Sequence, residues 1–149
     1  MNILKLELTH FGKFHLKTIT FTSGLNIVYG KNEAGKSTIH AFVRSMLFGI
    51  PDTEEGNERY SHYLPWETPH DFCGKMWIKK DDKVYRIERN FLRPQPTVRV
   101  FDDETGESLQ PAKQHLRQIL SGLTETSYLN TICIEQLKSA TDPQLAKEL

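Results

Sequence analysis

The sequence predicts an α/β fold with a mixed sheet, and three observations support this prediction. A short apolar run over 24–29 leads through a glycine loop into a helical pattern over roughly 36–48. Residues 72–103 contain three β-rich runs separated by turn residues, as in an antiparallel meander. Further helical patterns flank these strands. We therefore expect a sheet with a parallel portion around the glycine loop, an antiparallel β arm and flanking helices.

The first thirty residues are predicted to form three strands. Residues 2–8 alternate apolar and polar side chains, which puts Leu4, Leu6 and Leu8 on one face. A second strand is expected over 14–21, after a turn at residues 10–13. The run over 24–29 is bounded by glycines and is apolar throughout, which indicates a buried strand.

The helix after the glycine loop has one apolar face. Its apolar residues recur at the spacing of a helix: Ile39, Phe42, Val43, Met46 and Leu47. Gly49 and Pro51 then supply a stop signal.

Residues 51–71 are predicted to form an acidic, turn-rich loop. It contains a cluster of aromatic and basic residues: Arg59, Tyr60, Tyr63 and Trp66. Such a cluster can stack on bases or dock a partner, or it can pin the loop to the body of the domain. The second interpretation is favoured, because no periodic basic residues accompany the rings.

The meander consists of predicted strands over 75–79, 84–89 and 97–101, and a turn at residues 104–106 closes the third strand. Arg99 interrupts the apolar run that precedes Asp102 and Asp103. Acidic residues at the end of an apolar strand can hold Mg²⁺ in an ATPase, and these two acids resemble that pattern. The turn residues after them favour a hairpin instead.

The C-terminal part is predicted to begin with a helix opened by Pro111 and ended near Gly122. Leu120-Ser121-Gly122-Leu123 is similar to the Leu-Ser-Gly-Gly signature of ATPases. Because Gly122 stands where a glycine commonly ends a helix, we interpret this segment as a helix end. A short helical piece over 124–129 and a strand over 131–134 follow, and Asp142-Pro143 opens a last helix.

Composition limits the classes of protein. The 149 residues suit one domain, and 19 Lys+Arg against 19 Asp+Glu give zero net charge, unlike a globally basic nucleic-acid binder. Cys73 and Cys133 lie in strand-like runs without metal-ligand spacing, so we expect buried thiols and a cytoplasmic protein. The six histidines show no metal pattern, and His40 lies away from the apolar helix stripe. No signal peptide or membrane span is expected.

The glycine loop carries the chemistry. Residues 30–37 read Gly-Lys-Asn-Glu-Ala-Gly-Lys-Ser, a complete G-x-x-x-x-G-K-S motif (Walker A, or P-loop), and Thr38 follows. Its glycines let backbone amides surround phosphates, Lys36 can reach the β- and γ-phosphates, and Ser37 can ligate Mg²⁺. The helix that starts here directs its positive end at the same phosphates. The motif therefore predicts nucleoside triphosphate binding. The GTP-selecting Asn-Lys-x-Asp string is absent.

The sequence also resembles a family. It is similar to the N-terminal half of the ATP-binding head of SMC-like ATPases of the SbcC type, and above all to bacterial YhaN-type AAA-family ATPases. The resemblance covers essentially all 149 residues, through segments 6–14, 24–38, 48–49, 63–67, 85–89 and 132–136.

The resemblance implies roles for two residues outside the loop. Gln136, at the end of a predicted strand, would reach Mg²⁺ and the attacking water. It lies 136 − 36 = 100 residues beyond Lys36, an interval that favours the SMC-like branch over transporter-type ATPases. The family often has a basic residue near the nucleotide where this chain has Gly12, so the next residue, Lys13, is the candidate for that contact.

The motif and the resemblance together predict ATP and Mg²⁺ as cofactors. The expected catalytic residues are Lys36 and Gln136, and the expected metal ligands are Ser37 and Gln136. The expected nucleotide contacts come from Lys13, Gly30, Asn32, Glu33, Ala34, Gly35, Lys36, Ser37 and Thr38.

The resemblance also implies what this sequence lacks. The Walker B acid, the signature motif and a switch histidine follow a coiled coil in this family, and that coiled coil would begin near residue 142. Residues 1–149 would thus be the N-terminal lobe of a head, inactive alone and completed by its own C-terminal lobe. Complete heads would form ATP-dependent homodimers in DNA repair or metabolism, with DNA and a metallophosphoesterase-type nuclease as possible partners.

Two other functions are compatible with a P-loop. A small P-loop kinase would need a lid carrying arginines, for which Arg86, Arg89 and Arg93 are available, although they lie in a strand-rich arm. A nucleotide-gated, non-catalytic interaction module would need no catalytic acid.

Overall fold

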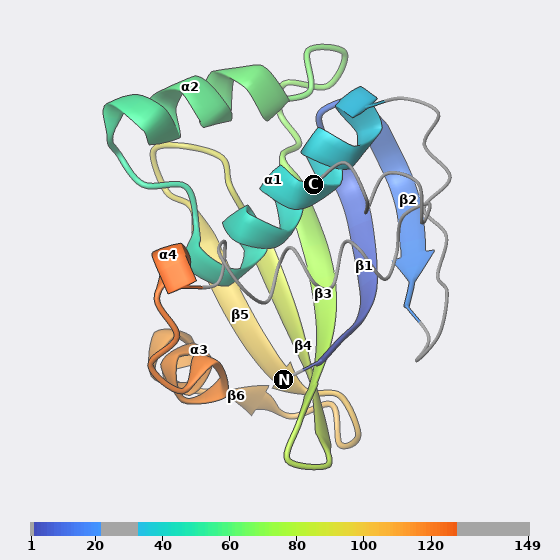
Figure 1. Ribbon diagram of the computed structural model, residues 1–149, viewed down its shortest axis with the longest axis vertical. Coiled ribbons are helices and arrows are strands. Elements are labelled where there is room, and N and C mark those ends of the chain that lie inside the picture. Colours follow the sequence, from blue (N-terminus) through green and yellow to red (C-terminus); the bar gives the residue numbers. More distant parts are fainter. Residues whose placement is uncertain (1, 22–32, 128–149) are drawn as a thin grey trace.

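The computed structural model of the chain describes residues 2–21 and 33–127 (Figure 1). Their elements are β1 (Asn2–Phe11), β2 (Phe14–Thr20), α1 (Glu33–Phe48), α2 (Glu54–Tyr63), β3 (Cys73–Lys80), β4 (Lys83–Asn90), β5 (Thr97–Asp102), β6 (Ser108–Leu109), α3 (Ala112–Leu120) and α4 (Glu125–Ser127).

The described strands form one six-stranded sheet in the order β2-β1-β3-β4-β5-β6, and every pair is antiparallel. The strands predicted over 2–8, 14–21, 75–79, 84–89 and 97–101 are confirmed. The antiparallel arm is not a separate unit, because β3 pairs directly with β1. The strands expected over 24–29 and 131–134, and with them the parallel portion, lie outside the described residues, as does the helix expected from 142.

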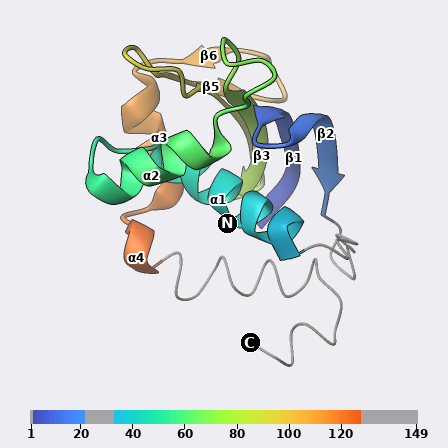
Figure 2. The same ribbon diagram turned by 90° about the horizontal axis from the view of Figure 1, so that it is seen from above.

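The core lies on the face of the sheet that the helices cover (Figure 2). One row of cross-strand partners on this face is fully buried: Leu6, Met76, Ile87 and Val100, from β1, β3, β4 and β5. Because side chains alternate along a strand, this row fixes the register of four strands at once.

Helix α1 lies across this face against β1, β3 and β4 (Figure 1). All five apolar residues of its predicted face are buried, so that prediction is confirmed. Gly74 on β3 allows the close approach: a Cβ there would lie 2.2 Å from Cε1 of Phe42, a fully buried side chain on α1.

The prediction of a loop over 51–71 is wrong for its first half, which is helix α2. Thr53 caps the helix, its hydroxyl accepting a hydrogen bond from the Gly56 amide at 3.0 Å, and Glu54 and Glu55 complement the helix dipole in the first turn. Gly56, which suggested a turn, is required by packing, because a Cβ there would lie 1.9 Å from the carbonyl oxygen of Pro51.

The predicted C-terminal helix α3 packs against β5 through Leu116 and Ile119. Its end is at the predicted place, but the left-handed cap residue is Ser121 (φ 52°), one residue before Gly122. Lys80 from the β3–β4 hairpin donates to the carbonyls of Gln118 (2.7 Å) and Ile119 (2.8 Å) and so neutralises this helix end. The short helical piece expected next is present as α4. Within the described ranges, no helix is long and apolar enough to cross a membrane.

We predict that Gly74→Ala destabilises the chain by about 1–3 kcal/mol, because the added methyl group overlaps Phe42 in a packed core. Urea denaturation measures the change. Gly106→Asn is the control: Gly106 lies in a turn at φ 77°, a Cβ there would have nothing within 4 Å, and asparagine tolerates this conformation. Equal stability of Gly74→Ala and the parent chain would show that α1 does not depend on this contact.

Candidate nucleotide-binding site

The end of the predicted phosphate loop forms the first turn of α1. Helix α1 begins at Glu33, so the backbone of Ala34, Gly35, Lys36 and Ser37 is helical. The first four amides of a helix have no carbonyl partner within the helix. They are therefore available to an anion at this end. Gly30, Asn32 and Gln136 lie outside the described residues.

The opposite end of α1 is capped from the sheet. Arg89 on β4 donates from Nε to the carbonyl of Met46 at 2.6 Å and from Nη2 to that of Leu47 at 3.4 Å. Helix α1 has no basic residue in its own last turn, so Arg89 supplies the positive charge that its dipole favours. Burial lowers the pKa of Arg89 to about 10, and the guanidinium remains charged at neutral pH.

A second arginine reaches the same helix end. Nη2 of Arg59, a buried residue of α2, lies 3.5 Å from the carbonyl oxygen of Gly49. Gly49 has φ 78°, and a Cβ there would lie 3.2 Å from Nη1 of Arg89. The glycine therefore leaves room for the arginine that caps the helix.

The turn between β1 and β2 lies against the N-terminal half of α1. The Gly12 amide donates to the carbonyl of Tyr63 at 2.6 Å, and a Cβ on Gly12 would lie 3.4 Å from Cγ2 of Thr38. Lys13, the next residue, is exposed in the same turn. Gly12 has φ 60°, a conformation that favours glycine.

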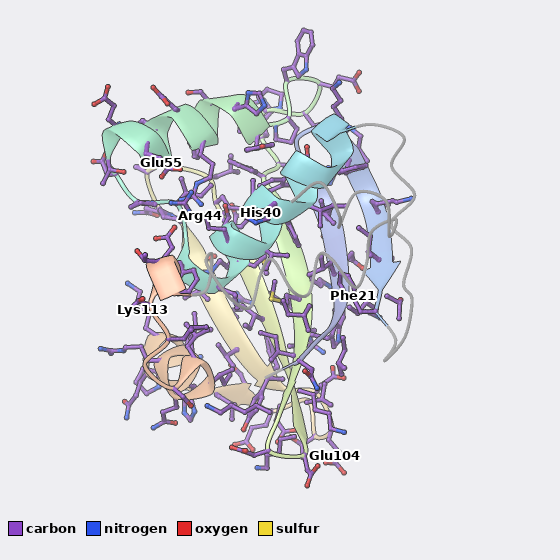
Figure 3. All side chains as sticks on the ribbon, viewed as in Figure 1. Phe21, His40, Arg44, Glu55, Glu104 and Lys113 are labelled. Carbon is purple, nitrogen blue, oxygen red and sulfur yellow. The ribbon has the colours of Figure 1, made fainter. Side chains whose placement is uncertain are left out.

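His40 is partly buried on α1, one turn beyond Lys36 (Figure 3). Burial, with a smaller effect of the positive charge of Arg44, lowers the pKa of His40 below its ordinary value. The lowered pKa favours the neutral form of the imidazole.

The acids at the end of β5 belong to a hairpin, as predicted. The Asp102 side chain accepts hydrogen bonds from the amides of Glu104 (3.0 Å) and Thr105 (3.2 Å). The Asp103 carboxylate accepts from the indole of Trp77 at 3.2 Å and pairs with Arg86 at 3.3 Å. Among the described residues, no group of three or more His, Cys, Asp or Glu could hold a metal ion.

The aromatic and basic cluster of residues 59–66 mostly pins its segment to the core, as favoured from the sequence. The ring of Tyr63 stacks on Phe11 with centroids 5.2 Å apart, and Tyr60 packs edge-on against Phe72 at 5.2 Å. Trp66 differs, because it is 90% exposed.

Comparison with known proteins shows the family. A family model described as an AAA domain matches residues 1–141, so the chain belongs to this family of AAA domains. The resemblance to SMC-like ATPase heads of the SbcC and YhaN types is confirmed by this match and by two relatives.

The first relative is "Uncharacterized protein YhaN" of Bacillus subtilis (strain 168), 43% identical over 56 residues, which are 37% of this chain and 6% of the relative. The second is "DNA double-strand break repair Rad50 ATPase" of Thermococcus kodakarensis (strain ATCC BAA-918 / JCM 12380 / KOD1), 25% identical over 137 residues, which are 91% of this chain and 15% of the relative. The chain thus spans only a small part of the length of either relative.

Sequence reasoning misses the residues that hold α1 from outside. From the sequence, Arg89 is a candidate only for a kinase lid, and Arg59 only for base stacking, docking or pinning a loop. The available signal is that α1 has no basic residue in its own last turn, where the helix dipole favours a positive charge. The position of that charge depends on sheet register and cannot be read from the helix.

We predict that Arg89→Met lowers the free energy of unfolding by about 1.5–3 kcal/mol, the range for hydrogen bonds to charged groups. The carbonyls of Met46 and Leu47 lose their charged donor, and urea denaturation measures the loss. The control is Arg99→Met on the neighbouring strand β5, where the arginine is exposed. Equal effects of the two substitutions would contradict the capping role.

Proposed function

We propose that this chain is the ATP–Mg²⁺-binding half of an SMC-like ATPase head with a P-loop fold. One observation carries the proposal: a complete G-x-x-x-x-G-K-S motif runs into the first turn of a helix that is seated on the sheet and capped at its far end. Membership of the AAA domain family and similarity to a protein named as an ATPase support it.

In this proposal the phosphates bind at the start of α1. The loop glycines and the amides of residues 32–38 surround them, and Lys36 neutralises the charge of the β- and γ-phosphates. Ser37 and Gln136 would hold Mg²⁺, and Gln136 would also orient the attacking water. When bound, Mg²⁺ neutralises negative charge that develops on the phosphates during hydrolysis.

Hydrolysis is proposed for the full-length protein, because the chain covers 6% and 15% of the two relatives. In this proposal a C-terminal lobe would supply a Walker B acid and a signature motif, and two heads would close around ATP. A role in DNA repair, with DNA and a nuclease partner, is an extension of this proposal, supported by the name of the Rad50 relative.

The kinase alternative is disfavoured by the contacts of its candidate arginines. Arg89 caps α1, Arg86 pairs with Glu88 at 2.7 Å, and Arg93 donates to Asn57 at 2.6 Å. None of the three belongs to a helical lid. The other alternative is a nucleotide-gated, non-catalytic interaction module. Measuring ATP turnover by the full-length protein distinguishes this module from an ATPase.

We predict that Lys36→Ala weakens ATP binding by the full-length protein about 100-fold or more, because it removes the charge that contacts the phosphates. Isothermal titration calorimetry with ATP and Mg²⁺ measures binding, and Lys113→Ala on the exposed side of α3 is the control. Turnover by the full-length protein, but not by residues 1–149 alone, is expected. Phosphoryl transfer to a small acceptor by residues 1–149 alone would instead support a kinase.

We predict a smaller effect for Lys13→Ala, a loss of about threefold to tenfold in ATP affinity, as for an exposed charge near the ligand. Lys17→Ala is the matched control, because Lys17 is also exposed but lies farther along β2. If both variants bind ATP equally well, Lys13 does not contact the nucleotide.

A further inference from the structure

Two histidines face each other across the hairpin of β1 and β2. His10 and His15 are direct cross-strand partners in the register of these strands. Their Nδ1 atoms lie 3.3 Å apart, and the rings meet edge to face with centroids 5.5 Å apart. His15 has 39% of its side chain exposed and His10 is partly exposed, so the pair lies at the surface. The pairing depends on the hairpin register and is not visible as a ligand pattern in the sequence.

A carboxylate lies at the other ring nitrogen of His15. Oε2 of Glu67, in the segment after α2, is 3.8 Å from His15 Nε2. A carboxylate beside Nε2 favours the tautomer that carries its proton there, and Nδ1 then has a free lone pair. In this tautomer His15 Nδ1 accepts the hydrogen bond from His10 Nδ1. Glu67 thus prepares His15 Nδ1 as an electron-pair donor on the side that faces His10.

The fold anchors the backbone around these three side chains. Phe11, next to His10, is fully buried in the core. The Gly12 amide in the same turn donates at 2.6 Å to the carbonyl of Tyr63, which lies four residues before Glu67. Figure 1 shows the turn between β1 and β2 beside the segment that follows α2. Because the turn and this segment are joined, a ligand of the pair would have few groups to order.

We propose that His10 and His15 bind a divalent transition-metal ion of the Zn²⁺ class through their Nδ1 atoms, with Glu67 as the outer partner of His15. Two nitrogens that are each about 2.0–2.1 Å from a tetrahedral Zn²⁺ stand about 3.3–3.4 Å apart. The Nδ1 atoms are 3.3 Å apart. A carboxylate at the second ring nitrogen is the outer contact that metal-binding histidines commonly make. The inference does not depend on the proposed function.

The ligand atoms select the class of ion. Imidazole nitrogens suit Zn²⁺, Ni²⁺ and Cu²⁺, whereas Mg²⁺ and Ca²⁺ prefer oxygen. No third His, Cys, Asp or Glu of the described ranges completes a cluster here, so the remaining positions on the ion would be filled by water. When the ion binds, the proton of His10 moves from Nδ1 to Nε2 through solvent, and both imidazoles stay neutral. The ion thus replaces the proton of the hydrogen bond between the two rings.

The test measures Zn²⁺ binding by isothermal titration calorimetry to the full-length protein, prepared without a histidine tag and freed of metal by chelation. We expect His10→Gln and His15→Gln each to weaken one Zn²⁺ site per chain about 100-fold, the upper end of the cost of losing an outer contact. Glu67→Gln should weaken the same site only about tenfold, because it leaves both ligands in place. A large excess of Mg²⁺ should not compete with Zn²⁺.

The matched control is His115→Gln on α3. His115 is partly exposed, like His10, but α3 packs against β5 and not against the hairpin of β1 and β2. Equal Zn²⁺ binding by the parent, His10→Gln and His15→Gln would overturn the inference, and so would an equal loss in His115→Gln. If one of the two pair variants does not fold, the other decides.

Electron paramagnetic resonance of bound Cu²⁺ gives a readout that needs no variant. Cu²⁺ binds most nitrogen sites more tightly than Zn²⁺ does. We expect its spectrum in the parent protein to show coupling to imidazole nitrogen. Cu²⁺ bound to the parent without nitrogen coupling would contradict the assignment of His10 and His15 as ligands.

Discussion

The hydrogen bonds from Arg89 to the carbonyls at the end of α1 are the contact on which the rest of this fold depends most. They bring a guanidinium from the sheet to the negative end of the helix that begins at the phosphate loop. The helix is also seated in its middle, where Phe42 lies over Gly74, and near its start, where Thr38 lies against the turn at Gly12. Three points along one helix thus fix the direction in which its first turn faces.

This arrangement explains why residues from several elements of a small chain contact one helix, α1. Gly74 makes room for the ring of Phe42 on α1, and Gly49 leaves room for the guanidinium of Arg89 that caps the helix. Gly12, with φ 60°, forms the turn that lies against Thr38 of α1. Arg59 adds a second positive group at the C-terminal end. A rigid helix costs little reorganisation when an anion binds at its N-terminus, which is the physical advantage of preorganised donors.

The sequence predicts those parts of the fold that local patterns determine. The buried face of α1, the meander of β3, β4 and β5, and the hairpin at Asp102 follow from helical spacing, strand alternation and turn residues. Helix α2 is missed because Gly56 and the acidic residues look like a loop, whereas the cap at Thr53 and the contact with Pro51 favour a helix. The roles of Arg89 and Arg59 depend on contacts between residues distant in sequence, and no local pattern contains that information. The sequence predicts the candidate site as a P-loop motif. The structure adds the position of helix α1, whose first turn contains the end of that motif.

The most direct measurement of the central claim is amide hydrogen exchange of the full-length protein with and without saturating ATP and Mg²⁺. If the triphosphate binds at the start of α1, exchange should slow in peptides that cover residues 30–38, because the amides there become donors to phosphate. Peptides covering Gln136 should also be protected when Mg²⁺ is present. ATP binding that leaves residues 30–38 unchanged and protects another region would contradict the claim.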